Sequence, residues 1–169
     1  MINIILYQPE KPQNVGNIIR TCKAIGAFLH IIGPLTFRID DASLKRAGMD
    51  YIRGAEYELY PDYESFHNKY REQKIYYITR YGNTPPSSID FKKDKGDLFF
   101  MFGKESTGIP KEILKEHLDT CLRIPMKANI RCLNVSNCVA IVAYEALRQL
   151  DYEDLATSDY LKGGDYLEK

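Results

Sequence analysis

Short apolar runs alternate with segments in which apolar residues recur every third or fourth position along most of the chain. Compact apolar runs are typical of buried strands, whereas the three-to-four spacing is typical of amphipathic helices. The apolar runs predict strands at residues 2–7, 28–32, 56–60, 74–79, 97–102 and 120–124. Besides a first helix, described next, the helical spacing predicts four more helices, at residues 40–47, 61–72, 110–118 and 135–150.

The first helix is predicted from Val15, Ile18, Ile19 and Cys22, which share one face, with Asn14 as its N-cap. The helix at 61–72 would begin with its proline in the first turn, where a missing N–H costs nothing. Residues 81–88 are rich in Gly, Asn, Pro and Ser and predict a loop.

Alternation of strands and helices predicts an α/β fold, with a mostly parallel sheet flanked by helices. In such sheets ligands bind beyond the carboxyl ends of the strands, which directs attention to the loops after Thr79, Phe102 and Ile124. We expect one domain over residues 1–150, followed by a polar, loosely ordered C-terminal tail at 151–169.

Charge and cysteine content narrow the possible functions. The chain carries 23 basic and 23 acidic residues, so it is not a strongly basic nucleic-acid binder. If it binds RNA, its positive charge must be concentrated locally or supplied by two subunits. The four cysteines have neither C-x-x-C nor zinc-finger spacing, which favours buried reduced thiols and no metal site. No apolar stretch reaches bilayer length, so we expect a soluble cytoplasmic protein without membrane contact.

The segment at 102–110 ends a predicted strand and contains Gly103, Glu105 and Gly108. Its glycine spacing is that of a P-loop, but Ile109 and Pro110 stand where a P-loop needs Lys and Ser or Thr. The chain also lacks the G-x-G-x-x-G pattern of dinucleotide-binding folds. The segment is therefore either an ordinary strand-to-helix turn or a loop whose glycine lets a ligand approach the backbone.

Two further segments hold candidate chemistry. In residues 9–20, Asn17 and Arg20 are three positions apart and share a face opposite the apolar stripe, where Arg20 could bind a phosphate. The alternative is a capped helix with a solvated Arg. Residues 124–137 lead from a strand into the last helix, which Asn134 or Ser136 can cap. The backbone of the same loop could also bind the edge of an adenine.

Together and in this order, the three segments resemble the three sequence motifs of the SPOUT methyltransferases. The match is closest to the small tRNA (cytidine/uridine-34)-2′-O-methyltransferases, the TrmL/YibK group, and covers residues 1–150. Supporting matches lie at residues 29–32, 46–51 and 142–146. The resemblance implies a SPOUT α/β-knot, with a deep trefoil knot near the C-terminus, and a homodimer whose active sites use residues from both chains.

The resemblance also implies S-adenosyl-L-methionine as the methyl donor and S-adenosyl-L-homocysteine as the product. The positions that match cofactor contacts are Ile78, Gly103, Ile124, Met126, Cys132 and Leu133. Cys132 is a departure, because related sequences often carry Ser there, and a thiol is a weaker donor than a hydroxyl.

The implied reaction is methyl transfer to the ribose 2′-hydroxyl of the wobble nucleotide, a cytidine or modified uridine, in the anticodon of leucine tRNAs. Arg20 would hold a phosphate and stabilise negative charge on the 2′-oxygen, while Glu105 and Asn134 would order the loops. Two alternatives stay open: the same chemistry on rRNA, and a non-catalytic RNA-binding module that kept the fold. Candidate RNA contacts are Lys45, Arg46, Arg53 and Arg80.

Overall fold

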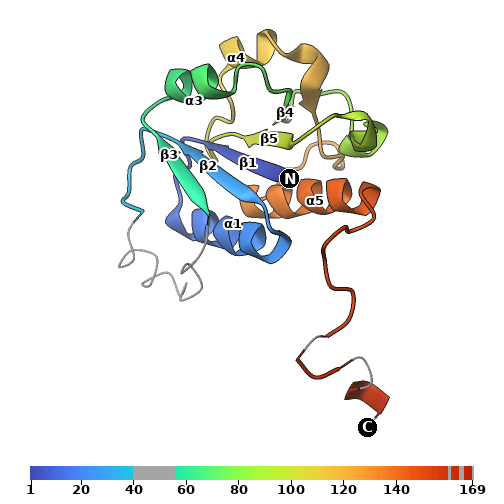
Figure 1. Cartoon of the computed structure of the whole chain (residues 1–169). Coiled ribbons are helices and arrows are strands. Elements are labelled where there is room, and N and C mark those ends of the chain that lie inside the picture. Colours follow the sequence, from blue (N-terminus) through green and yellow to red (C-terminus); the bar gives the residue numbers. More distant parts are fainter. Residues whose placement is uncertain (40–55, 160, 164–165, 169) are drawn as a thin grey trace.

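The computed structural model describes residues 1–39, 56–159, 161–163 and 166–168. The described strands form one six-stranded sheet in the order β3-β2-β1-β5-β4-β6, and every neighbouring pair is parallel (Figure 1). The strands are β1 (Ile2–Tyr7), β2 (Phe28–Ile32), β3 (Tyr57–Tyr60), β4 (Ile75–Ile78), β5 (Leu98–Phe102) and β6 (Cys121–Leu122). The predicted parallel α/β fold is thereby confirmed, whereas the predicted helix at 40–47 lies outside the described residues.

Helices cover both faces of the sheet. On one face α1 (Pro12–Ile25) and α5 (Val135–Gln149) pack side by side, and on the other lie α3 (Tyr63–Tyr70) and α4 (Lys111–Lys115) (Figure 1). Short 3₁₀ helices complete the described structure at Pro86–Ser88, Phe91–Lys93, Leu118–Thr120 and Tyr166–Glu168.

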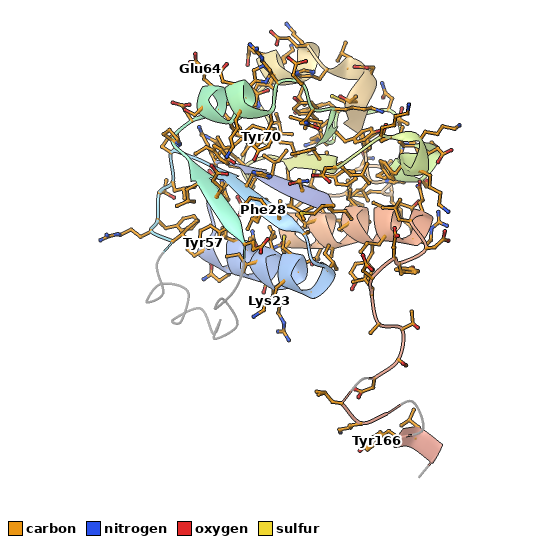
Figure 2. All side chains as sticks on the ribbon, in the orientation of Figure 1. Lys23, Phe28, Tyr57, Glu64, Tyr70 and Tyr166 are labelled. Carbon is orange, nitrogen blue, oxygen red and sulfur yellow. The ribbon has the colours of Figure 1, made fainter. Side chains whose placement is uncertain are left out.

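The core has two parts because successive side chains of a strand point to opposite faces. On β1, Ile4 and Leu6 pack with Val15 of α1 and Val139 of α5. Ile5, between them in sequence, packs on the other face with Phe66 of α3 and Leu114 of α4. Figure 2 shows the side chain of Tyr70 directed from α3 toward the sheet and that of Lys23 directed away from α1. A sheet buried on both faces explains why its strands read as continuous apolar runs.

Two predicted helix starts were wrong. Helix α1 begins at Pro12, its N-cap is Lys11, and Asn14 lies inside the first turn. Proline suits the first helical position because its fixed φ is helical and its absent N–H would have no partner there. Helix α3 begins at Tyr63 rather than at the proline before it, because the Asp62 carboxylate caps the helix by accepting a 2.8 Å hydrogen bond from the Ser65 N–H.

The last strand and the tail differ from expectation in extent. Strand β6 is shorter than the predicted 120–124, because Thr120 ends a 3₁₀ helix and the chain leaves the sheet after Leu122. Thr84 pairs with Leu122 through an isolated bridge, which ties the predicted 81–88 loop to this strand. After α5, Leu155 still packs against the core, and the described residues beyond it run away from the sheet (Figure 1). The predicted domain boundary at residue 150 stays a prediction.

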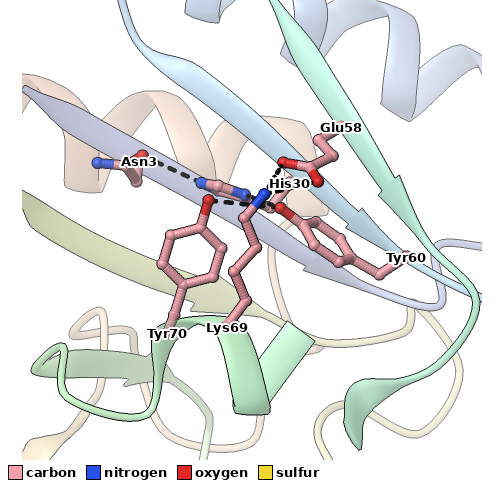
Figure 3. A network of polar contacts seen from close by, with 6 residues as sticks. All are labelled: Asn3, His30, Glu58, Tyr60, Lys69 and Tyr70. Carbon is pink, nitrogen blue, oxygen red and sulfur yellow. Dashed lines mark hydrogen bonds and ion pairs between the residues drawn. The ribbon is translucent and has the colours of Figure 1, made fainter. Parts of the chain in front are cut away.

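A buried polar cluster, formed by Asn3, His30, Tyr60 and Tyr70, lies between the sheet and α3 (Figure 3). His30 is 1% exposed, with Nε2 3.0 Å from Asn3 Oδ1 and Nδ1 3.0 Å from the Tyr60 hydroxyl. A neutral ring that carries its proton on Nε2 satisfies both contacts, since Asn3 Oδ1 can only accept. Burial lowers the pKa of His30 to about 4, which keeps the ring neutral in the fold.

Candidate active site at the carboxyl edge of the sheet

The candidate site lies where four neighbouring parallel strands end. Strands β1, β5, β4 and β6 are adjacent in the sheet, so the loops that follow them meet at one edge. These loops are residues 8–11, 103–110, 79–85 and 123–134. The carboxyl edge of a parallel sheet is where ligands bind in open α/β folds, and all three sequence segments with candidate chemistry contribute to it.

The loop after β5 closes tightly on itself. Lys104 and Gly108 exchange two backbone hydrogen bonds, of 3.2 and 2.9 Å, and Gly108 has a φ of +76°, which favours glycine. A Cβ placed on Gly103 would lie 2.2 Å from the carbonyl carbon of Gly108 and 2.3 Å from the nitrogen of Ile109. The contact that requires glycine at position 103 is therefore with its own loop, as expected for a tight strand-to-helix turn, and the approach of a ligand to Gly103 stays a prediction.

Glu105 projects from this loop to the beginning of α1. Its carboxylate accepts hydrogen bonds from the backbone N–H groups of Glu10 at 2.9 Å and Lys11 at 3.2 Å. A third bond, of 2.7 Å, comes from the side-chain amide of Asn14. Glu10 and Lys11 precede Pro12, the first helical residue, so the carboxylate holds the chain where it enters α1, near the positive end of the helix dipole. Three donors directed at one carboxylate suit an organising group better than a free base.

Asn14 continues this network into the third segment. Its side-chain oxygen accepts a 3.0 Å hydrogen bond from the side-chain amide of Asn134. Asn134 in turn caps α5, because its Oδ1 accepts from the Ser136 N–H at 2.8 Å and from the Ser136 hydroxyl at 2.7 Å. The chain of contacts from Glu105 through Asn14 to Asn134 therefore joins all three segments; we call it the Glu105–Asn14–Asn134 network.

Asn14 belongs to the candidate site, but the sequence interpretation misses it there. The sequence predicts it as the cap of α1, whereas in the structure it is 5% exposed and lies between Glu105 and Asn134. Pro12 is the signal that could have corrected this, since a proline favours the first helical position and so places Asn14 within the first turn. A polar side chain buried there requires partners from elsewhere in the chain.

A second connection runs in the opposite direction between the same two loops. The Glu10 carboxylate accepts hydrogen bonds from the Ser106 N–H and the Ser106 hydroxyl, both at 2.8 Å. These two bonds hold the pKa of Glu10 below its usual value. Each segment therefore binds an acidic side chain of the other: Glu105 binds the start of α1, and Glu10 binds the loop after β5. These reciprocal contacts fix the relative position of the two segments.

Arg20 lies on the exposed side of α1. It follows Asn14 by six residues, which corresponds to about 9 Å along the helix axis. Asn17 is exposed on the same side, and the residues between them, Ile18 and Ile19, are buried in the core. The predicted division of α1 into an apolar face and a face with Asn17 and Arg20 is therefore confirmed.

The predicted cofactor positions fall on the same edge. Half-buried positions are Ile78, Gly103, Ile124 and Met126; exposed positions are Cys132 and Leu133. The four cysteines are free thiols, but Cys132 is exposed, so the expectation of buried thiols is wrong for it. Cys22 and Cys121 are buried as predicted.

The loop at 124–133 offers unused backbone polar groups. Within the described part of the chain, most backbone N–H groups of this loop outside the turn at 128–129 donate to no other described residue. The side chains of Ile130 and Leu133 are 62% and 40% exposed there. An adenosine presents apolar ring faces and polar edges, so a loop that combines exposed apolar side chains with free backbone donors and acceptors fits such a group.

Among the described residues, no group of three or more His, Cys, Asp or Glu side chains could hold a metal ion. None of the described helices is long and apolar enough to cross a membrane.

The fold and the site define an α/β protein in which hydrogen bonds join the candidate ligand-binding loops at the carboxyl edge of a parallel sheet. The chain belongs to the SpoU rRNA methylase family, which matches residues 1–144. It is 41% identical to the tRNA (cytidine(34)-2′-O)-methyltransferase of Escherichia coli (strain K12), over 94% of this chain and 100% of that protein. The tRNA (cytidine(34)-2′-O)-methyltransferase of Aeromonas hydrophila is 43% identical over 90% of this chain and 96% of that protein.

Similar solved structures support this family assignment. One, which concerns 2′-OH methylation of C/U34 on tRNA, has 38% identity and a TM-score of 0.81 over 90% of this chain and 98% of that chain. An AdoMet-bound rRNA methyltransferase from Sinorhizobium meliloti has 26% identity and a TM-score of 0.76, over 88% of this chain and 56% of that chain. The predicted SPOUT-class fold is thereby confirmed, while the trefoil knot stays a prediction.

Proposed function

We propose that this protein transfers the methyl group of S-adenosylmethionine to the ribose 2′-oxygen of nucleotide 34 in tRNA. The observation that carries the proposal is the Glu105–Asn14–Asn134 network, which assembles the three family segments at one edge of the sheet. The two tRNA (cytidine(34)-2′-O)-methyltransferases that share 41% and 43% identity with the chain support position 34 as the target.

In this reaction a bond forms between the 2′-oxygen and the methyl carbon, and the bond from that carbon to the sulfonium breaks. The 2′-hydroxyl releases its proton to solvent water, and the sulfonium becomes a neutral thioether. When bound, S-adenosylmethionine supplies the electrophilic methyl group. We assign its binding to Ile78 at the end of β4 and to the loops that contain Gly103, Ile124, Met126, Cys132 and Leu133.

Arg20 is the residue to which we assign the main catalytic contribution. Its guanidinium cation can hold a phosphate next to the target nucleotide and stabilise negative charge that develops on the 2′-oxygen. Glu105 and Asn134 are positioning residues in this scheme, because their polar atoms already serve α1, α5 and Asn14. Orientation of the two reactants supplies much of the remaining acceleration.

We further propose that the protein acts as a homodimer on the anticodon loop of leucine tRNAs in the cytoplasm. An anticodon loop suits this chemistry since its bases are unstacked and its 2′-hydroxyls accessible. Support for the dimer comes from α5, where Ile141 and Tyr144 are 44% and 48% exposed on the side of the helix away from the core. Covering these side chains with a second copy would remove apolar surface from water.

The decisive experiment is mass spectrometry of nucleosides after incubation of the protein with S-adenosylmethionine and unmodified leucine tRNA. We expect a 2′-O-methylated nucleoside at position 34, and its absence would overturn the proposal. A parallel incubation with rRNA tests the alternative substrate. Binding of S-adenosylmethionine without methyl transfer to either RNA would indicate the non-catalytic module.

A further inference from the structure

The loop after β4 is fastened to β6 by several contacts. The Thr79 N–H donates to the Leu122 carbonyl at 2.9 Å, and the Arg123 N–H donates to the Thr84 carbonyl at 2.9 Å. Between these bonds, Gly82 lies so close to β6 that a Cβ on it would be 2.7 Å from the carbonyl carbon of Leu122. Backbone bonds at both ends and close packing in the middle hold residues 79–84 in one conformation.

Two side chains of this braced loop project outward. Tyr81 is 70% exposed, and the guanidinium of Arg80 lies 5.7 Å from the centroid of its ring. The Arg123 guanidinium donates a 2.7 Å hydrogen bond to the carbonyl of Arg80, and the Tyr81 N–H donates to the Thr79 hydroxyl at 3.3 Å. These bonds fix the backbone of Arg80 and Tyr81, while the Tyr81 ring and the Arg80 guanidinium stay accessible to solvent.

The position of this pair relates it to the candidate active site. Strand β4 lies between β5 and β6, so its loop is flanked by the loops at 103–110 and 123–134. The segment from 79 to 89 contains no acidic residue, and Arg80 and Arg123 add positive charge to it. No carboxylate of this segment would therefore repel a phosphate bound there.

We propose that Tyr81 and Arg80 form a contact site for the substrate RNA, in which an unpaired base stacks on the Tyr81 ring and Arg80 neutralises a neighbouring phosphate. The proposal rests on the proposed function, since it takes an RNA as the substrate. Aromatic rings bind unpaired bases of any sequence, and an Arg beside the ring strengthens the contact. Unpaired loop nucleotides can present their faces in this way, whereas paired ones cannot.

The test compares Tyr81→Ala, Tyr81→Phe and Arg80→Ala with the unaltered protein. RNA affinity is measured by fluorescence anisotropy with a labelled anticodon stem-loop at several salt concentrations. Affinity for S-adenosylmethionine is measured by calorimetry, and KM and kcat by transfer of a radioactive methyl group. Tyr166→Ala is a matched control, because Tyr166 is 53% exposed and has Lys162 4.4 Å from its ring centroid, but lies in the C-terminal tail.

We expect Tyr81→Ala to weaken RNA binding at least about fivefold and to raise KM for tRNA similarly, with kcat and the affinity for S-adenosylmethionine kept. Tyr81→Phe should stay within about twofold of the unaltered protein, because it keeps the ring. Arg80→Ala should reduce the slope of log affinity against log salt by about 0.7 to 0.9, as expected for one lost phosphate contact.

Unchanged RNA affinity in Tyr81→Ala would overturn the contact site. So would an equal loss of affinity for S-adenosylmethionine, which would show that the ring covers the methyl donor instead. If the unaltered protein binds the stem-loop but transfers no methyl group, the proposed function fails, and the anisotropy of the Tyr81 variants still decides the contact site independently.

Discussion

The side-chain amide of Asn14 donates a 2.7 Å hydrogen bond to the carboxylate of Glu105, which follows it by 91 residues. This bond and the one from the Lys11 N–H tie the loop after β5 to the start of α1, the helix that carries Arg20. The start of α1 and the loop after β5 are consequently one structural unit.

Asn14→Asp tests this unit. The change places a second carboxylate against Glu105, so we expect a loss of about 2–3 kcal/mol in the free energy of unfolding at pH 7.5. The like charge raises the pKa of the new group in the folded state, so the fold binds a proton more readily than the unfolded chain does. The difference in stability between Asn14→Asp and the unaltered protein should therefore shrink as the pH falls toward 5.

Urea denaturation at pH 5 and pH 7.5 measures this effect. Asn17→Asp is the matched control, because Asn17 is exposed on the same helix and the change should stay within about 0.5 kcal/mol. A new acid near a helix N-terminus is otherwise stabilising, by up to about 1 kcal/mol. Equal stability of the two variants at pH 7.5 would therefore contradict the Asn14–Glu105 contact.

Arg20→Ala should lower kcat for methyl transfer by at least about 100-fold, as removal of one charge-stabilising donor does in other enzymes. The affinity for S-adenosylmethionine should persist, because Arg20 is assigned to the RNA side of the reaction. Single-turnover kinetics together with calorimetry check both expectations. Lys23→Ala, an exposed cation of the same helix, serves as the control, and equal turnover of the two variants would exclude a central role for Arg20.

Gly103→Ala should destabilise the protein by more than about 2 kcal/mol or prevent folding. The added Cβ would meet backbone atoms of Gly108 and Ile109, which cannot rotate away as a side chain can. Gly96→Ala is the control: its Cβ would meet open space, and its φ of +102° alone should cost about 1 kcal/mol. Thermal unfolding of both variants measures the loss of stability. An equal loss of stability in the two variants would contradict the tight packing at Gly103.

Stability should also fall in acid because of His30. Burial lowers its pKa from 6.5 to about 4, so between these values the unfolded chain binds a proton that the fold does not. The free energy of unfolding should therefore decrease by about 2–3 kcal/mol as the pH falls from 6.5 to 4. Urea denaturation across this range measures the slope. His30→Gln should be less stable overall but should lose this component of the slope; an unchanged slope would contradict the assignment.

Part of this protein could be predicted from its sequence alone. Apolar runs located β1, β2 and β5, and the Val135–Gln149 helix was expected from its apolar stripe. The division of α1 into a buried face and a face with Arg20 also followed from local spacing. Such features are determined locally, because the periodicity of side chains along a helix or strand decides which face can be buried.

The tertiary structure decided the rest. The partners of Asn14, which are Glu105 and Asn134, lie 91 and 120 residues away, and only the strand order β3-β2-β1-β5-β4-β6 brings their loops together. The same holds for Gly103, whose need for glycine comes from the return of its own loop. A sequence shows which side chains can donate and accept, but strand order and loop closure determine which of them meet.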